Sequence, residues 1–259
     1  MAVLVAIVAA AGCASASASP IALPPTGGAP DYQLGAAYPP GAQVTIVARD
    51  RTAPSPEGKY GICYVNAFQT QPGESGSWPA DVLLRDDGGS PVHDPDWPDE
   101  VVLDTRTAEQ RASIRDVVSG WINDCASKGY DAVEFDNIDT YTRVPALRGE
   151  DAVALARDLT AVAHGVGLAA AQKNAAEDAS ALREAGFDFA VAEECSAYDE
   201  CASYTGVYGE HVVDIEYTDN LPRPFAQMCG GSGAVRSMVL RDRDLVAPSD
   251  PGYHFELCP

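Results

Sequence analysis

Positive charge is scarce in this sequence. Its 259 residues contain 17 Lys and Arg against 38 Asp and Glu, which gives a formal net charge of −21. A field of this sign repels phosphate backbones, so we expect no nucleic-acid partner. Long hydrophobic runs are also missing, since none approaches the roughly 20 residues that cross a bilayer. With 46% hydrophobic and 21% charged residues, the composition is that of a soluble globular protein.

Several motifs that mark other enzyme classes are absent. No GxSxG elbow occurs near the four histidines, which disfavours a Ser-His-Asp hydrolase. No GxGxxG or GxxxxGK[ST] loop is available to hold a nucleotide phosphate. The seven cysteines contain no CxxC pair, and the histidines show no HxxxH spacing, so we expect no zinc site. We predict no cofactor and no metal.

The N-terminal segment has the features of an export signal. Residues 1–12 are apolar and lead through Ala-Ala-Gly into Cys13, the small-residue pattern of a cleavage site. This pattern is similar to a bacterial lipobox, in which the cysteine carries a lipid, although no Lys or Arg stands near Met1. An Ala-x-Ala cut within 14–18 would instead release the protein. We expect a secreted protein or a cell-surface lipoprotein that touches the membrane only through this lipid.

Residues 13–35 are rich in Ser, Ala, Pro and Gly and are predicted to form a flexible tether before a domain that spans 36–259. Beyond Cys13, six cysteines remain, an even number typical of disulfides in an oxidising compartment. Fifteen pairings are possible. Short spacing, the value of fixing the C-terminus, and elimination favour Cys195–Cys201, Cys229–Cys258 and Cys63–Cys125.

Strand-like and helix-like segments alternate along the domain. The clearest helix begins at Thr107, where Gln110 completes a capping box. Strict alternation predicts an α/β fold with a parallel sheet, and eight repeats favour a single-domain (β/α)8 TIM barrel over an open sheet. The connection 49–59 is too short and proline-rich for a helix, so the first βα crossover is shortened. The predicted strands are 43–48, 60–67, 100–104, 131–136, 166–172, 187–193, 211–216 and 235–241.

Carboxylates gather at the ends of these strands. In the strand 131–136, Glu134 and Asp136 share one face and the bulky apolar residues share the other. If the apolar face packs on the helices, both acids turn into the barrel near its C-terminal rim, where barrel active sites lie. The strand 211–216 repeats the pattern, which predicts that Asp214 and Glu216 also face inward.

Other predicted strand ends add polar residues. Lys173 follows the strand 166–172 and would offset part of the negative charge. In the strand 187–193, alternation turns the bulky residues outward and favours Glu194 as the inward acid, although one bulge would exchange it with Glu193. The remaining polar residues at these ends are Asn174, Asp104 and Arg106, the last equally suited to an ion pair or a substrate contact.

Acids that converge from separate strands are what glycoside hydrolysis requires, since one protonates the leaving oxygen and another attacks the sugar or activates water. Aromatic residues near the same ends could stack on sugar faces, although packing is the commoner role of such residues. They are Tyr64, Trp97, Tyr141 and Tyr217.

The longest motifs resemble those of glycoside hydrolase family 114, the endo-α-1,4-polygalactosaminidases, over about residues 45–245. The resemblance is carried by Cys63-Tyr64, Leu103-Asp104-Thr105-Arg106, the run from Lys128 to Tyr141 that contains Val-Glu-Phe-Asp-Asn-Ile-Asp-Thr-Tyr, Lys173-Asn174, the run Phe187-Asp-Phe-Ala-Val-Ala-Glu-Glu-Cys195 with Tyr198 and Cys201, and Ile215-Glu-Tyr-Thr218. Phe135 stands where the family often carries Pro.

This resemblance implies a hydrolase of α-1,4-linked, partly deacetylated and therefore cationic galactosamine polymers. By motif, Asp136 would be the nucleophile and Glu193 the general acid/base, with Glu194 kept as the alternative catalytic residue. Glu134, Asp139 and Glu216 are candidates for contacts to the ammonium groups of the substrate. The other candidate substrate-binding residues are Tyr64, Asp104, Lys173, Asn174 and Tyr217.

Two rival functions use the same residues differently. A surface lipoprotein on the same barrel could bind polysaccharide without cleaving it. Alternatively, Glu134, Asp136 and Asp139 could hold Mg²⁺ or Ca²⁺ in a phosphodiesterase, although no EF-hand spacing is present.

Overall fold

The computed structural model of the chain describes residues 21–230 and 233–259. The predicted signal sequence 1–12, the lipobox Cys13 and the first part of the predicted tether lie outside the described residues. The strands are β1 (Pro30–Gln33), β2 (Ile46–Asp50), β3 (Tyr60–Asn66), β4 (Ala132–Asp136), β5 (Ala169–Lys173), β6 (Phe189–Glu193), β7 (Val212–Tyr217), β8 (Ser237–Arg241) and β9 (Phe255–Leu257). The helices are α1 (Ala108–Ser127), α2 (Thr140–Arg143), α3 (Gly149–Gly165), α4 (Ala179–Glu184), α5 (Cys201–Tyr208) and α6 (Phe225–Met228), with short 3₁₀ turns η1 (Ser75–Ser77) and η2 (Ala176–Asp178).

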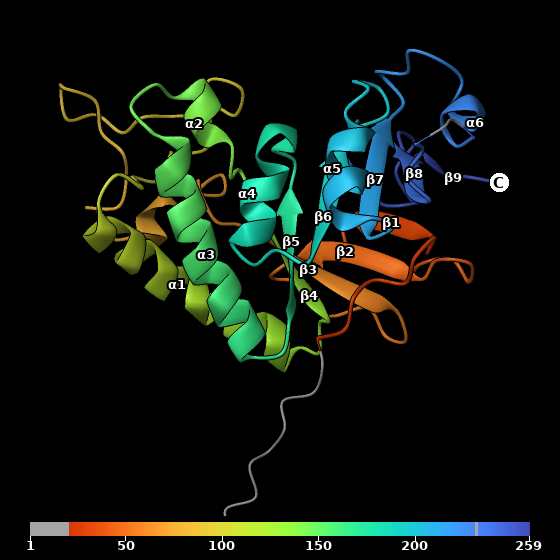
Figure 1. Cartoon of the computed structure of the whole chain (residues 1–259), viewed down its shortest axis with the longest axis horizontal. Coiled ribbons are helices and arrows are strands. Elements are labelled where there is room, and N and C mark those ends of the chain that lie inside the picture. The colour runs from red at the N-terminus through yellow and green to blue at the C-terminus, as the bar shows by residue number, and fades with distance from the viewer. Residues whose placement is uncertain (1–20, 231–232) are drawn as a thin grey trace, which may run out of the picture.

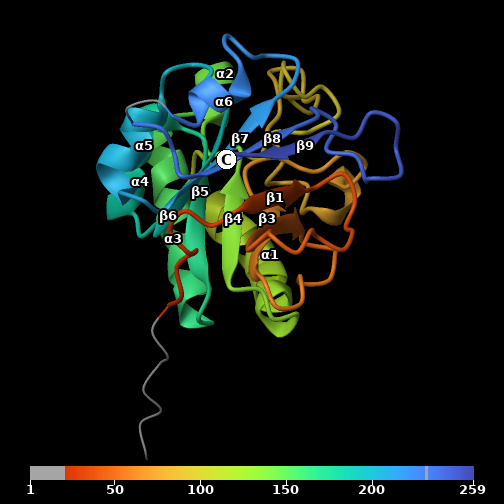
Figure 2. The same cartoon turned by 90° about the vertical axis from the view of Figure 1, so that its right-hand side faces the viewer.

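Eight parallel strands form an almost closed barrel and follow one another in chain order from β1 to β8. β9 then pairs antiparallel with β8, and the two lie together in Figure 2. Figure 1 shows α1, α3 and α4 side by side along one side of the strands. The predicted TIM barrel is confirmed. Within the described part of the chain, no helix combines the length and apolar character needed to span a bilayer.

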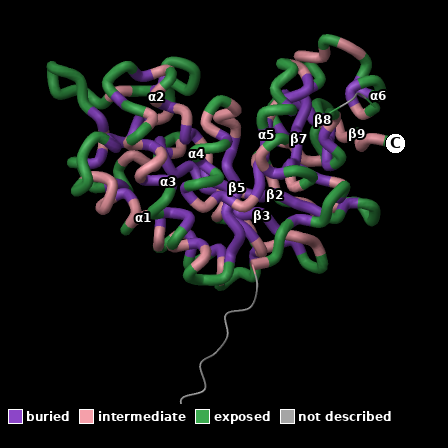
Figure 3. The backbone as a smooth tube through the Cα atoms, in the orientation of Figure 1, coloured by how far each residue is buried: buried purple, intermediate pink, exposed green. Residues whose placement is uncertain are grey.

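Strand alternation produces two apolar layers, one inside the barrel and one beneath the helices. Figure 3 shows that the buried segments follow the strands, whereas the loops at their ends are largely exposed. The inner layer includes Ile46, Ile62, Phe189, Val191, Val213 and Ile215. The outer layer includes Val65, Val133, Phe135, Ile114, Val118 and Leu159.

The helix α1 begins as its sequence predicts. The backbone N–H of Gln110 donates to the Thr107 hydroxyl at 3.2 Å, which satisfies one of the free amides of the first turn. Its buried positions then recur at helical spacing and turn one face toward the barrel. They are Ile114, Val118, Ile122 and Cys125.

One of the eight predicted strands is wrong. Residues 101–103 do not enter the barrel but form isolated antiparallel bridges within the long connection between β3 and α1. The first barrel strand is instead β1, which lies inside the predicted tether 13–35, so the prediction that the tether extends to residue 35 is also wrong. β1 was hidden because its sequence is Pro-Asp-Tyr-Gln, and it buries Asp31 and Gln33 rather than an apolar run.

The short connection predicted at residues 49–59 is present. It joins β2 to β3, so it is the second connection of the barrel and not the first. No helix occurs between β2 and β3, nor between β1 and β2. Two prolines and the short length of the segment after β2 leave only turns there. The helical layer therefore starts with α1.

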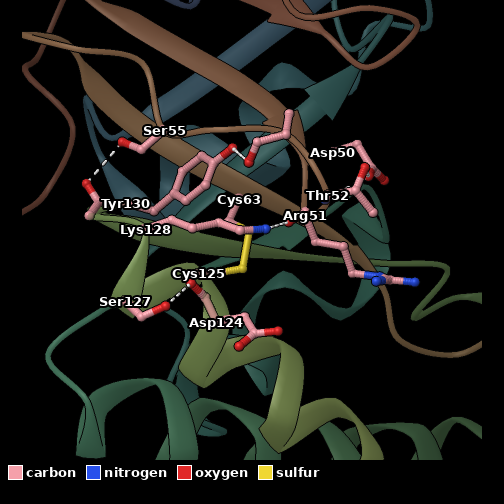
Figure 4. The surroundings of a disulfide bond; sticks show 12 residues. Asp50, Arg51, Thr52, Ser55, Cys63, Asp124, Cys125, Ser127, Lys128 and Tyr130 are labelled. Carbon is pink, nitrogen blue, oxygen red and sulfur yellow. Dashed lines mark hydrogen bonds between the residues drawn. A yellow bond between two sulfur atoms is a disulfide. The ribbon is translucent and has the colours of Figure 1, made fainter.

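All three favoured disulfides are formed: Cys63–Cys125, Cys195–Cys201 and Cys229–Cys258. The first ties β3 to the last turn of α1 (Figure 4). Around it, the Lys128 ammonium donates to the Arg51 carbonyl, and the Ser55 hydroxyl donates to the Gly129 carbonyl at 3.0 Å. These contacts fasten the helix-free β2–β3 connection to the end of α1.

A buried arginine joins the two ends of the barrel. Arg241 at the end of β8 is fully buried, and its guanidinium donates to the Asp31 carboxylate at 3.1 Å and to the Tyr32 carbonyl. On the other side of β1, Arg49 of β2 donates to the side chain of Gln33 at 2.9 Å. The polar residues of β1 are thus paired from both sides, which allows a short polar strand to complete the barrel.

Candidate active site

Polar side chains replace the apolar inner layer at the C-terminal ends of the strands. In β4, alternation continues from the interior residue Ala132 to Glu134 and Asp136, as predicted. The register places Asn66 of β3 beside Asp136. The same inward face carries Tyr64 on β3, Lys173 on β5, Glu193 on β6 and Tyr217 on β7.

The ammonium of Lys173 is the centre of this group. Its Nζ lies 3.2 Å from Glu193 Oε2, 3.6 Å from Asp136 Oδ2 and 3.5 Å from Glu134 Oε1. Lys173 is only 2% exposed, so solvent contributes little to balancing its charge. Asp136 and Glu193 therefore share one counter-ion, although they come from strands that are far apart in the sequence.

A second set of contacts lies beneath the ammonium. The Tyr32 hydroxyl donates to Glu134 Oε1 at 2.6 Å and accepts a hydrogen bond from Lys173 Nζ at 3.0 Å. Glu134 is fully buried, and its Oε2 has no hydrogen-bond partner among the described residues. Because Glu134 and Lys173 are buried below the rim, they are poorly placed for the substrate contacts predicted for them.

Asp136 is held by donors on both of its oxygens. The Tyr64 hydroxyl donates to Oδ2 at 2.7 Å, and the backbone N–H of Asn137 donates to Oδ1 at 2.7 Å. Asn137 has a φ of 62°, a left-handed conformation that Asn tolerates better than most residues. The turn after β4 thus directs a backbone donor at the carboxylate.

Glu193 is held in a similar way. The Tyr217 hydroxyl donates to Oε1, and the Asn174 amide donates to Oε2 at 3.2 Å. Asn174 also accepts the backbone N–H of Glu193 at 2.8 Å. Asn174 and Tyr217 were predicted to contact substrate, and the structure places both beside the carboxylate of Glu193.

These contacts shift the protonation equilibria of the group. Burial raises the pKa of Glu193, but Lys173, Tyr217 and Asn174 outweigh burial and hold that pKa below its usual range. Burial alone would lower the pKa of Lys173, yet the surrounding carboxylates raise it well above normal, so the side chain is an ammonium. Burial raises the pKa of Glu134 to about 7 against the opposing effect of Lys173.

The orientation of β6 shows which of Glu193 and Glu194 faces the barrel interior. Phe189 and Val191 lie in the inner layer, so alternation turns Glu193 inward, and the expectation that Glu194 faces inward is wrong. The barrel interior below the polar rim is apolar, and it accepts the bulky residues of β6. Glu194, at a φ of 61°, is instead paired with the guanidinium of Arg243 at 2.8 and 2.9 Å.

The acids of β7 also face opposite to the prediction. Val213 and Ile215 lie in the inner layer, so Asp214 and Glu216 point outward, beneath the loop that follows β6. Asp214 accepts the backbone N–H of Cys195 at 3.2 Å, and Glu216 accepts that of Ser196 at 2.8 Å. The proposed substrate contact of Glu216 is therefore wrong, because the residue fixes a loop behind the site.

The carboxylate of Asp104 also forms structural hydrogen bonds, with Arg106 and Gln110. The Arg106 guanidinium donates to both of its oxygens at 2.8 and 2.7 Å, and Gln110 of α1 donates at 2.8 Å. This pair anchors the start of α1, so Asp104 is not free to bind substrate. Asp139 lies nearer the site, where its carboxylate pairs with Arg143 at 3.1 Å.

Sequence reasoning missed several residues around Asp136. Tyr32 lies on the strand that was assigned to the tether. Asn66 ends β3, and its amide donates to Glu100 Oε2 at 2.8 Å. Burial, together with the charges of Asp136 and Asp94, raises the pKa of Glu100 to about 7. Glu100 sits in the long β3–α1 connection, and no periodic pattern could have placed it.

The metal alternative does not fit this geometry. The Lys173 ammonium lies between Glu134 and Asp136, where a cation would have to bind, and Arg143 pairs with Asp139. In the described part of the chain, the potential ligands that lie close together are Cys195, Cys201 and Asp214, but both sulfurs form a disulfide.

Two inward carboxylates at the C-terminal end of a parallel barrel are the arrangement typical of glycoside hydrolases. The family model for glycoside hydrolase family GH114 matches residues 10–259. The chain therefore belongs to this family and is a glycoside hydrolase. No curated protein matches the chain in a sequence comparison.

Solved structures share the fold at low sequence identity. Aspergillus fumigatus Ega3, in complex with galactosamine, superposes with a TM-score of 0.75 at 21% identity, over 94% of this chain and 100% of that one. The glycoside hydrolase domain of Pseudomonas aeruginosa PelA gives 0.57 at 16% identity, over 85% and 96%. A maltogenic α-amylase from Thermotoga neapolitana, AmyB, gives 0.51 at 11% identity, over 83% and 67%.

The outward pair Asp214 and Glu216 predicts how stability depends on pH. Burial and the charge of Glu216 raise the pKa of Asp214, and burial, helped by the charge of Glu194, raises the pKa of Glu216. The folded chain therefore keeps protons that the unfolded chain releases above about pH 4. Stability should therefore fall as pH rises from 5 to 8. In Asp214→Asn, this fall should be shallower by up to about 1.4 kcal/mol per pH unit, the slope of one extra bound proton.

Urea unfolding of the wild type and Asp214→Asn at several pH values measures this slope. Asp116→Asn, an exposed substitution on α1, serves as the control and should follow the wild type. Identical slopes for wild type and Asp214→Asn would show that the pair holds no extra proton.

Proposed function

We propose that this glycoside hydrolase cleaves α-1,4-linked, galactosamine-containing cationic polysaccharide outside the cell, with Asp136 and Glu193 as its two catalytic carboxylates. The observation that carries the proposal is the shared ammonium of Lys173, within 3.6 Å of an oxygen from each acid. This brings the two acids together at one rim, as cleavage of a single linkage requires.

The separation of the acids supports a double displacement. Because these two oxygens lie within 3.6 Å of the same nitrogen, they are at most about 7 Å apart, which is compatible with the ~5 Å separation of retaining enzymes. Asp136 attacks the anomeric carbon, the glycosidic bond breaks, and the leaving oxygen takes the proton of Glu193. Glu193 then removes a proton from the water that hydrolyses the glycosyl ester.

The charges around the site support a cationic substrate. Glu134, Asp136 and Glu193 share Lys173, Asp94 and Asp139 share Arg143, and Glu194 pairs with Arg243, as the ion-pair distances indicate. Glu100 has only the neutral amide of Asn66 and forms no ion pair with a described Lys, Arg or His. An ammonium group of galactosamine would supply that missing charge. Ega3, which shares the fold, was solved with galactosamine bound.

An exposed ring lies next to this carboxylate. Trp97 is 57% exposed, and its carbonyl accepts the backbone N–H of Glu100 at 2.9 Å, so one turn carries both residues. The turn is anchored by buried Asp94, which accepts the N–H of Trp97 at 3.3 Å and pairs with Arg143. A sugar that stacks on Trp97 could therefore place an amine near Glu100.

Export is supported by the three disulfides, which are typical of proteins folded in an oxidising compartment. The apolar segment 1–12 and Cys13 lie outside the described residues, and the lipid anchor remains a proposal from the sequence. We propose that 1–12 directs export and that the barrel acts at the cell surface or in the surrounding medium.

Substitution of either acid should abolish cleavage without abolishing binding. Asp136→Asn and Glu193→Gln should each lower kcat on deacetylated α-1,4-galactosamine polymer by at least about 10³-fold, because each removes a group that reacts in the transition state. Mass spectrometry of the released oligosaccharides measures the rate, and co-sedimentation with the polymer measures binding.

The neighbouring variant Glu194→Gln is the matched control, because it also removes one carboxylate charge but keeps one acceptor oxygen for Arg243, and it should stay within about tenfold of wild type. A wild type that binds the polymer without cleaving it would establish the non-catalytic alternative. Full activity of Glu193→Gln with loss in Glu194→Gln would reverse the assignment of the acid.

The carboxylate of Glu100 should determine the preference for deacetylated chains. Glu100→Gln should raise KM for the deacetylated polymer by about tenfold, the effect of losing one charge-assisted hydrogen bond, and should leave the acetylated polymer unchanged. The pKa of Glu100 is about 7, so this preference should strengthen as pH rises toward 7, where the carboxylate ionises while the amine of the substrate is still protonated. It should weaken as salt rises.

Steady-state kinetics on polymers of graded acetylation, at low and high salt, provide the measurement. Glu57→Gln, an exposed glutamate before β3, controls for the loss of one negative charge. An equal change in KM for acetylated and deacetylated chains would remove Glu100 from amine recognition.

A further inference from the structure

Lys173 lies where a substrate cannot readily reach it. The side chain is 2% exposed, and Tyr32 and Glu134, at 1% and 0%, close the space beneath it. Its Nζ also lies 5.3 and 5.6 Å from the ring centroids of Tyr32 and Tyr64. Two aromatic rings, a hydroxyl and three carboxylates surround the ammonium and fix its position.

The distances from this ammonium to the two acids differ little. Glu193 Oε2 lies at 3.2 Å and Asp136 Oδ2 at 3.6 Å. A cation placed in this way favours neither carboxylate strongly, because Coulomb energy varies with the inverse of distance. The hydrogen bond to the Tyr32 hydroxyl at 3.0 Å holds the ammonium back from both.

The proposed reaction moves one negative charge between these same two acids. The step needs Asp136 as the attacking anion and Glu193 as the proton donor, so the pKa of Glu193, which is held low in the free enzyme, must rise when the bound sugar excludes water from the site. When Asp136 forms its bond to the anomeric carbon, its charge is lost in the ester, while Glu193 gives its proton to the leaving oxygen and becomes the anion. The pair therefore carries one negative charge before and after the step, but on a different residue.

We propose that Lys173 is a positioning residue that stabilises this charge on either acid, with Tyr32 and Glu134 holding it midway between them. The proposal rests on the proposed function of Asp136 and Glu193. It reassigns Lys173 and Glu134 from substrate binding to the support of the catalytic pair. Because the ammonium is already in place, no reorganisation is needed when the charge moves.

Lys173→Met tests the role of the charge. We expect kcat to fall by about 10²–10³-fold, as on removal of one preorganised donor, with KM within about twofold of wild type. Loss of the cation should also raise the pKa of Glu193, so the alkaline limb of the pH profile of kcat/KM should move to higher pH. A purely structural role would not shift the alkaline limb of the kcat/KM profile.

The pH at which this limb falls depends on Glu193 and also on the other titratable groups that face Lys173. These groups are Asp136, Glu134, Tyr32 and Tyr64.

Two further variants keep the proposal testable if Lys173→Met folds poorly. Lys173→Ala should regain activity with added ethylammonium but not with ethanol, which lacks the charge. Tyr32→Phe keeps the ring and removes the hydroxyl that restrains the ammonium, so kcat should fall by about tenfold without a change in KM. Lys59→Met, whose ammonium donates to the Val44 carbonyl at 2.6 Å near the start of β3, is the control and should match wild type.

The outcomes separate this proposal from the proposed function. Wild-type kcat and an unshifted alkaline limb in both Lys173→Met and Tyr32→Phe, with Asp136→Asn inactive, would overturn the role of Lys173 alone. Loss of activity that appears only as a higher KM would place Lys173 in substrate binding. An inactive wild type would overturn the proposed function itself.

Discussion

The arrangement of the site depends on burying one cation among three carboxylates. An unpaired carboxylate inside a barrel is costly, and two would repel each other. The Lys173 ammonium lies within 3.6 Å of Glu134, Asp136 and Glu193 and makes their common burial possible. Small inner residues on β4 and β5, such as Ala132 and Ala171, leave room beneath the rim for the long lysine side chain and the ring of Tyr32.

Other acidic residues of the chain are also paired with a cation, which is an arginine in each case. Arg241 pairs with Asp31 where the barrel closes, and Arg243 pairs with Glu194 behind the site. The long β3–α1 connection is held over the rim by the Arg143–Asp94 pair. The net charge of −21 would attract the cationic substrate that we propose.

The repeating pattern of strands and helices was enough to predict the barrel, and the pairing of Glu134 with Asp136 on one face followed from the apolar residues between them. The same rule failed on β6 and β7. There the bulky residues fill the barrel interior, so Glu193 turns inward and Glu216 turns outward. Whether the larger residues of a strand face helices or barrel depends on what the neighbouring strands contribute, and a single strand does not contain that information. β1 escaped prediction because it buries Asp31 and Gln33 instead of an apolar run, and the arginines that pair with them come from other strands.

Trapping the glycosyl-enzyme tests the central claim most directly. An activated 5-fluoro α-galactosaminyl substrate should slow hydrolysis of the ester more than its formation, so that the sugar accumulates on the enzyme. Peptide mass spectrometry should then find one added sugar on Asp136, and Glu193→Gln should still accept the label from a substrate whose leaving group needs no protonation. Labelling of Glu193 or Glu194, or turnover with inversion and no label, would contradict the account.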